Sequence, residues 1–142
     1  LISGCLLSTG EVEAVPGTYI ISATDSYEDG WSTGESVQVT VDGKVYRFGS
    51  SAPEPWSGSV ANLGNAFDDG ASYTWTFEMP AGAQKMTWAW HSGYYDDEVG
   101  FTITHVNTED KSQSVVSYGI YPMGTATSPG DVGALSGMSL CY

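Results

Sequence analysis

Carboxylates are the side chains with the clearest chemistry in this sequence, and the densest group of them lies within residues 25–31. Asp25, Glu28 and Asp29 stand there in a stretch that reads Asp-Ser-Tyr-Glu-Asp-Gly-Trp. The two aspartates and the glycine match the first, fifth and sixth positions of a helix–loop–helix calcium loop, whose ligands are hard oxygen atoms. The match then fails, because Ser36 occupies the position of the bidentate glutamate. A calcium site here therefore needs ligands from elsewhere in the chain.

A second group of acids, Asp96, Asp97 and Glu98, could supply those ligands. Two acidic loops at the same end of a domain repel each other unless a cation lies between them. Zinc or copper would want more histidine and cysteine than this chain has, since it contains only two of each. The alternative is a set of solvated acids, because aspartate favours turns. We predict one Ca²⁺ site whose candidate ligands are Asp25, Glu28, Asp29, Asp96, Asp97 and Glu98.

Aromatic side chains form the second set of candidate binding residues. The chain has five tryptophans and nine tyrosines, and exposed aromatic rings can stack on the apolar C–H faces of sugars. Trp56, Tyr94 and Tyr95 lie in expected loops and are candidate glycan contacts. Three other tryptophans alternate with polar residues and are expected in the core: Trp75, Trp88 and Trp90.

The sequence offers little for catalysis. It has no Gly-x-Ser-x-Gly, no His-Glu-x-x-His and no phosphate-binding glycine loop. Of its two histidines, His105 continues a strand pattern and is expected to pack at a strand end, while His91 lies near the second acidic loop. Paired carboxylates can hydrolyse glycosides, but these acids lie in turns of a short chain. We predict that the protein is not an enzyme.

The elements that must position these residues read as β-strands. Eighteen glycines and six prolines interrupt every helical pattern, and short runs instead alternate apolar and polar residues. Asp42-Gly43 is a two-residue hairpin signal. Residues 49–70 are expected to form a long irregular connection, and 124–137 a loop, an edge strand or an assembly surface. The runs expected to be strands are 18–23, 36–41, 45–48, 73–79, 86–90, 99–103 and 114–121.

Strands of this number with closely spaced turns predict an all-β fold, an antiparallel two-sheet sandwich that is jelly-roll-like. With 142 residues the chain fits one domain, 1–142. Its formal charge of −13 argues against nucleic acid and anionic membranes as partners. No apolar run approaches the length of a transmembrane segment.

The two acidic stretches together resemble a known group of modules. Residues 24–31, followed by 88–101, look like secreted β-sandwich modules with an Asp-Ser-Tyr-Gly-Asp-Gly-Trp motif and a later Gly-x-x-x-Glu-(Ile/Val) motif. Such modules occur in extracellular proteins of algae, other protists and marine bacteria, and are similar in outline to calcium-binding CUB-like domains. The resemblance implies that Asp25 and Asp29 match the first acidic pair and Glu98 the later glutamate. Glu28 replaces the usual glycine, so the turn is altered or gains a ligand.

Cys5 and Cys141 stand near the two ends of the sequence and are expected to be oxidised, to each other or across a subunit contact. The alternatives are a lipoprotein cleavage box at residues 2–5, in which Cys5 would be lipidated, and two buried free thiols. A disulfide would place the protein outside the cell or on its surface.

These observations lead to two hypotheses for function. The first is a secreted, calcium-stabilised structural or adhesive sandwich that self-assembles into an extracellular surface or fibre. An apolar strip within residues 1–7 would pair with a neighbouring copy, unless it packs as an ordinary first strand: Leu1, Ile2, Leu6 and Leu7. The second is a lectin-like carbohydrate-binding module, in which calcium assists glycan binding.

Overall fold

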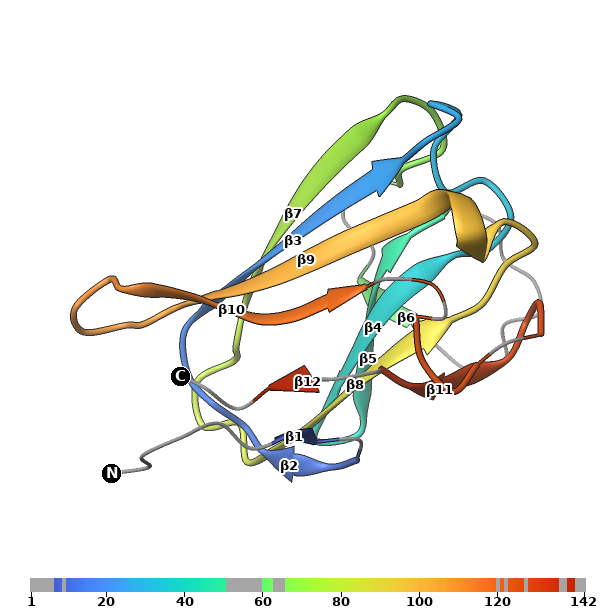
Figure 1. Ribbon diagram of the computed structural model, residues 1–142. Coiled ribbons are helices and arrows are strands. Elements are labelled where there is room, and N and C mark those ends of the chain that lie inside the picture. Colours follow the sequence, from blue (N-terminus) through green and yellow to red (C-terminus); the bar gives the residue numbers. More distant parts are fainter. Residues whose placement is uncertain are drawn as a thin grey trace.

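The computed structural model is built almost entirely of β-strands (Figure 1). It describes residues 7–8, 10–50, 60–62, 66–119, 121, 123–126, 128–135 and 138–139. Within these residues the one helical element is a single 3₁₀ turn, η1 (Asp96–Glu98). None of the described segments forms a helix long and apolar enough to cross a bilayer.

Two antiparallel sheets pack against each other. In the four-stranded sheet the order is β10 (Gln113–Gly119), β9 (Val99–Val106), β3 (Thr18–Asp25) and β7 (Ser72–Glu78). Its inner strand β3 pairs along its length with β7 and β9. This pairing sets Asp25 opposite Val99, at the strand ends that carry the two acidic stretches.

The second sheet has six strands. Its main path runs β11 (Val132–Ala134), β8 (Lys85–His91), β4 (Ser36–Val41), β5 (Lys44–Gly49) and β6 (Val60–Asn62). β2 (Val12–Glu13) also pairs with β8, and β6 runs parallel to β5. A separate pair joins β1 (Leu7–Ser8) to β12 (Met138–Ser139). The chain crosses repeatedly between the sheets, which confirms the predicted all-β sandwich.

The hydrophobic core lies between the sheets, because alternate residues of each strand point inward. Trp75, Trp88 and Trp90 are buried as predicted. Trp31, which follows the first acidic stretch, is fully buried, and its ring centroid lies 5.3 Å from that of Trp90 at an interplanar angle of 80°. Its indole N–H also donates to the Thr24 carbonyl at 3.0 Å. The core therefore anchors the loop that carries the acids.

The strands lie where the alternation predicted them, and the hairpin turn lies at Asp42-Gly43. One expectation needs correction: the stretch 49–70 is not wholly irregular, since β6 lies within it. The stretch 124–137 contributes β11, which lies at the edge of the six-stranded sheet, so the predicted edge-strand alternative is confirmed. Short strands such as these rest on pairing with a neighbour and leave little periodic signal.

Several sequence predictions fall outside the described residues. These concern the candidate glycan contact Trp56, the cysteines Cys5 and Cys141, and the apolar residues Leu1, Ile2 and Leu6.

Candidate metal centre

The first acidic stretch forms a tight turn directly after β3. Asp25 is buried, and its two carboxylate oxygens accept hydrogen bonds from the backbone N–H groups of Tyr27, at 3.2 Å, and Asp29, at 2.9 Å. This is the turn that aspartate forms with the backbone that follows it. It places the Asp29 side chain on the same side of the turn as Asp25, since both belong to one carboxylate cluster.

Two residues of this turn have left-handed backbone. Glu28 has φ 61° and Gly30 has φ 76°. Glycine adopts this region at no steric cost, whereas other L-residues are disfavoured there. Glu28 thus occupies the position at which the resembling motif has glycine, and it does so in a conformation that glycine prefers.

Residues 66–70 pack against this turn, a contact that no sequence pattern predicts. The N–H of Gly30 donates to the Gly70 carbonyl at 3.1 Å, and that of Trp31 donates to the Phe67 carbonyl at 2.7 Å. In return, the Gly70 N–H donates to the Glu28 carbonyl at 3.2 Å. The backbone of the acidic turn is therefore fixed by its neighbour rather than by solvent.

The third acid arrives through the pairing of β3 with β9. Glu98 is the last residue of η1 and directly precedes Val99, the partner of Asp25. The Ser26 N–H donates to the Glu98 carbonyl at 2.9 Å, which joins the two loops. As a result, Asp25, Asp29 and Glu98 each offer a carboxylate oxygen, and these oxygens lie within 4.8 Å of one another. We call these three residues the acidic triad.

Burial and neighbouring charges disfavour the ionised forms of two residues of the acidic triad, Asp25 and Glu98. Burial raises the pKa of Asp25, and the Asp29 side chain raises it further, against the two backbone N–H bonds that lower it. Partial desolvation raises the pKa of Glu98, and the charges of Asp25, Asp29, Asp97 and Glu35 add to that rise. The ionised form of each carboxyl group is therefore disfavoured. A bound cation would favour the ionised form and lower both pKa values. The acidic triad could hold a metal ion.

The other three predicted ligands are not part of the acidic triad. Asp96 is buried, and its carboxylate accepts hydrogen bonds from the Ser92 hydroxyl at 2.6 Å, the Gly93 N–H at 2.9 Å and the Trp90 indole at 3.1 Å. Asp96 therefore closes the loop after β8. Glu28 and Asp97 are exposed neighbours of the acidic triad in the sequence and do not belong to it.

A buried carboxylate that sequence reasoning missed, Glu35, ties the two loops together. It accepts from the Thr33 N–H at 2.9 Å, the Thr33 hydroxyl at 2.6 Å and the Tyr95 N–H at 3.0 Å. The Tyr94 N–H in turn donates to the Thr33 hydroxyl oxygen at 3.0 Å. These bonds set the spacing between the two loops that carry the acidic triad. A lone glutamate before a strand carries no pattern that would reveal this role.

The histidines lie inside the fold. His91 is buried beneath the loops, with Nδ1 at 2.6 Å from the Gly34 carbonyl oxygen. Burial lowers the pKa of His91, and the charge of Arg47 also lowers it, against the Gly34 bond, Asp96 and Glu35, which raise it. His105 is buried at the far end of β9, with Nε2 at 2.7 Å from the Pro16 carbonyl oxygen, so it packs as predicted.

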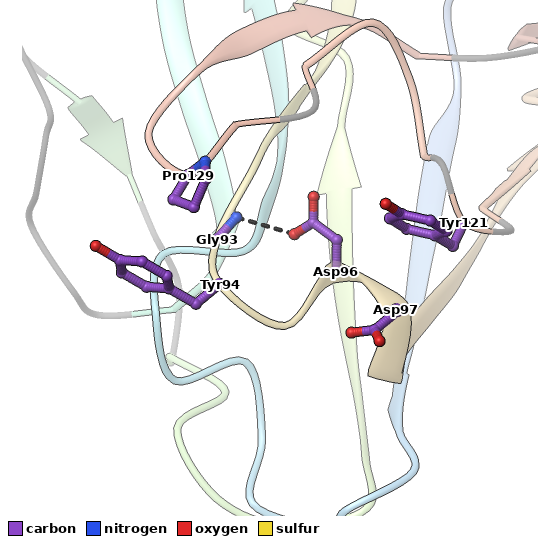
Figure 2. A pocket seen from close by; sticks show the side chains of 6 residues that line it. All are labelled: Gly93, Tyr94, Asp96, Asp97, Tyr121 and Pro129. Carbon is purple, nitrogen blue, oxygen red and sulfur yellow. Dashed lines mark hydrogen bonds between the residues drawn. The ribbon is translucent and has the colours of Figure 1, made fainter.

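A surface pocket of about 230 Å³ is lined in part by Asp96 and Asp97, which directly precede Glu98 of the acidic triad (Figure 2). The predicted glycan contact Tyr94 lines it, whereas Tyr95 does not. Both tyrosines are exposed, as predicted for loop residues. The residues that line the pocket are Gly93, Tyr94, Asp96, Asp97, Tyr121 and Pro129.

Comparison with protein-family models, with curated proteins and with solved structures gives no match to this chain.

Proposed function

We propose that this chain is a secreted, non-catalytic β-sandwich in which one Ca²⁺ joins two loops, and that its role is structural or adhesive. The observation that supports this is the acidic triad, in which carboxylate oxygens from two loops lie within 4.8 Å of one another. The resemblance of both acidic stretches to secreted calcium-binding modules supports the same proposal.

The donor set favours calcium over other cations. All side-chain ligands of the acidic triad are carboxylates, without histidine or cysteine, which suits a hard cation. Ca²⁺ takes about six to eight oxygens at about 2.3–2.6 Å and tolerates irregular geometry. Carboxylates that bind through both oxygens, with backbone carbonyls and water, can reach that number. Mg²⁺ demands near-ideal octahedral geometry and gives up its water reluctantly.

The effect of the ion would be on stability. The loops are already joined by the Ser26–Glu98, Tyr94–Thr33 and Tyr95–Glu35 hydrogen bonds. The charge of a bound Ca²⁺ would offset the repulsion within the acidic triad. A ligand that binds only the folded state stabilises it by mass action.

Thermal unfolding of the full chain tests this proposal. At free Ca²⁺ of about 100 times Kd, the stabilisation is about 2.7 kcal/mol. At about 3 °C per kcal/mol for a chain of this length, Tm should rise by about 8 °C over the chelator-treated protein. Mg²⁺ at the same concentration should give a smaller shift.

Variants of the acidic triad make the test specific. Glu98→Gln and Asp29→Asn keep the side-chain shape and should abolish the calcium-dependent shift. Glu109→Gln, which changes an exposed acid in the β9–β10 turn, should leave it intact. A Tm that does not respond to calcium, or a shift that persists in both acidic-triad variants, would contradict the proposal.

Self-assembly is a separate part of the proposed role and rests on the sequence of residues 1–7. Light scattering of the full chain and of a variant that lacks these residues measures it directly, because the truncated chain should stay folded but remain monomeric. Non-reducing gels test the proposed bonding of Cys5 and Cys141. A mobility shift on reduction indicates an internal disulfide, and a covalent ladder indicates one between subunits.

A further inference from the structure

We propose that the pocket beside η1 binds one neutral saccharide unit, which stacks on its tyrosines and donates hydrogen bonds to Asp97. We call it the tyrosine pocket. Its volume of about 230 Å³ suits a single sugar ring rather than an extended chain. It lies between the loop after β8 and the two residues Tyr121 and Pro129 (Figure 2). Asp97, which lines it, directly precedes Glu98 of the acidic triad.

Two exposed aromatic rings border the tyrosine pocket. Tyr94 is 73% exposed and Tyr121 is 58% exposed, which leaves ring faces available to a ligand. Figure 2 shows Tyr94 and Pro129 on one side, and Tyr121 and Asp97 on the other, with the Asp96 carboxylate between them. Large aromatic side chains that remain in water near a concave polar surface are typical of ligand contacts.

The floor of the tyrosine pocket is rigid. The Asp96 carboxylate accepts hydrogen bonds from Ser92, Gly93 and Trp90, so it cannot turn away from its position. Trp90 is itself fully buried in the core. A pocket whose base is fixed in this way is present before the ligand arrives, which lowers the ordering cost of binding.

The polar groups around the pocket favour a ligand with hydroxyl groups. The Asp97 and Asp96 carboxylates can only accept hydrogen bonds, whereas the Tyr121 hydroxyl, which points toward Asp96 in Figure 2, can donate and accept. Sugar hydroxyls complement both kinds of group, and their C–H faces complement the rings. An ammonium group only donates hydrogen bonds, so it would leave the Tyr121 hydroxyl without an acceptor for its own hydrogen.

Charge narrows the class of sugar. The chain carries a formal charge of −13, and the pocket itself contains two carboxylates. Sulfated and uronic-acid sugars would be repelled from this end of the molecule. The ligand is therefore a neutral hexose or deoxyhexose unit, alone or at the end of a glycan.

The tyrosine pocket is also expected to respond to calcium, and this part of the inference rests on the proposed calcium site. Asp96, Asp97 and Glu98 are consecutive residues of η1. An ion held by Glu98 would restrict the turn that presents Asp97 to the ligand. Calcium should then tighten saccharide binding, and by linkage the saccharide should tighten calcium binding.

Binding of the full chain to an array of glycans tests the inference. The probes are neutral oligosaccharides of glucose, galactose, mannose and fucose. Alginate and sulfated galactan serve as anionic comparison probes, and oligolysine serves as the cationic one. Affinities for the neutral glycans that bind are then measured by calorimetry, with calcium and with chelator.

Point variants locate the binding. Tyr94→Ala and Tyr121→Ala should each weaken neutral glycan binding about tenfold, which corresponds to about 1.4 kcal/mol. Asp97→Asn should also weaken it. The control is Tyr118→Ala on β10, because Tyr118 is 62% exposed but does not line the pocket. That variant should bind glycans like the parent chain.

The outcomes separate this inference from the calcium proposal. Absence of binding to every neutral glycan would overturn the inference, as would binding only to oligolysine or to the anionic glycans. So would equal losses in the Tyr118 control and the pocket variants. Glycan binding by a chain whose Tm ignores calcium would support the tyrosine pocket while the calcium proposal fails.

Discussion

A methyl group at Gly30 should destabilise the protein far more than one at another left-handed glycine. Gly30 has φ 76°, and a Cβ there would lie closer than 3.0 Å to backbone atoms of Phe67, Asp68 and Asp69. Because these are main-chain atoms, no side-chain rotation can relieve the clash. Residues 67–69 would have to move, and the hydrogen bond from the Trp31 N–H to the Phe67 carbonyl would be disturbed.

The size of the effect follows from two contributions. Placing alanine in the left-handed region costs about 1–2 kcal/mol, and overpacking against backbone costs about 1–3 kcal/mol. Alanine also lowers the conformational entropy of the unfolded chain, which stabilises the folded state by about 0.4–1 kcal/mol. Gly30→Ala should therefore lower the free energy of unfolding by about 1–5 kcal/mol, which is the sum of the two costs less the gain from the unfolded chain.

Gly43→Ala is the matched control. Gly43 has φ 85° in the β4–β5 hairpin, and a Cβ there meets no atom of the described residues within 4 Å. It should lose only the conformational contribution, about 1 kcal/mol or less. Urea unfolding of the parent and both variants gives the two differences, with unchanged slopes as the check on two-state behaviour. Equal losses in the two variants would show that residues 66–70 do not lie against the acidic turn as described.

Three further predictions concern the loops. Asp96→Ala should lower the free energy of unfolding by about 3 kcal/mol, because three hydrogen-bond donors lose their acceptor. The control Asp97→Ala should change it by less than about 0.5 kcal/mol. Similar losses for the two variants in a urea titration would contradict this prediction. The pKa of His91 is lowered by burial, so the unfolded chain binds the proton more tightly, and stability should fall as pH drops below about 6.5. An NMR titration in which His91 gains its proton at or above the ordinary pKa would refute that sign. Glu28→Gly should leave the free energy of unfolding unchanged or raise it by up to about 1 kcal/mol. Glycine removes the strain of a left-handed residue, but it also raises the conformational entropy of the unfolded chain. A loss beyond about 1 kcal/mol in the same urea titration would count against the described turn.

The longer strands were predictable because their apolar residues alternate along the chain. The alternation of Val37, Val39 and Val41, and of Trp88 and Trp90, marks residues that face the core. The short strand β6 was not predictable, and for β11 an edge strand was only one of three alternatives expected for residues 124–137. They are held by backbone pairing to a neighbour, which imposes no pattern on the side chains.

The sequence predicted that two acidic loops meet, but it did not predict which of their acids form the acidic triad. Three of the six proposed ligands lie in one cluster. Asp96 could not be distinguished from Asp97 by sequence, because its orientation is set by donors from Trp90, Ser92 and Gly93. The roles of Glu35 and Gly70 depend on contacts between segments far apart in the chain, which leave no local signal.

The close approach of Trp31 to Trp90 gives the molecule an optical property of its own. Two indoles 5.3 Å apart at 80° couple their electronic transitions, and Trp75 lies 6.0 Å from Trp31 as well. Trp31 follows the turn of Asp25 and Asp29, while the Trp90 indole N–H is bonded to Asp96, so the coupled pair spans both loops. A change in loop spacing therefore alters the circular dichroism of the native protein. The circular dichroism of the tryptophan pair therefore reports the spacing of the two loops without an added label.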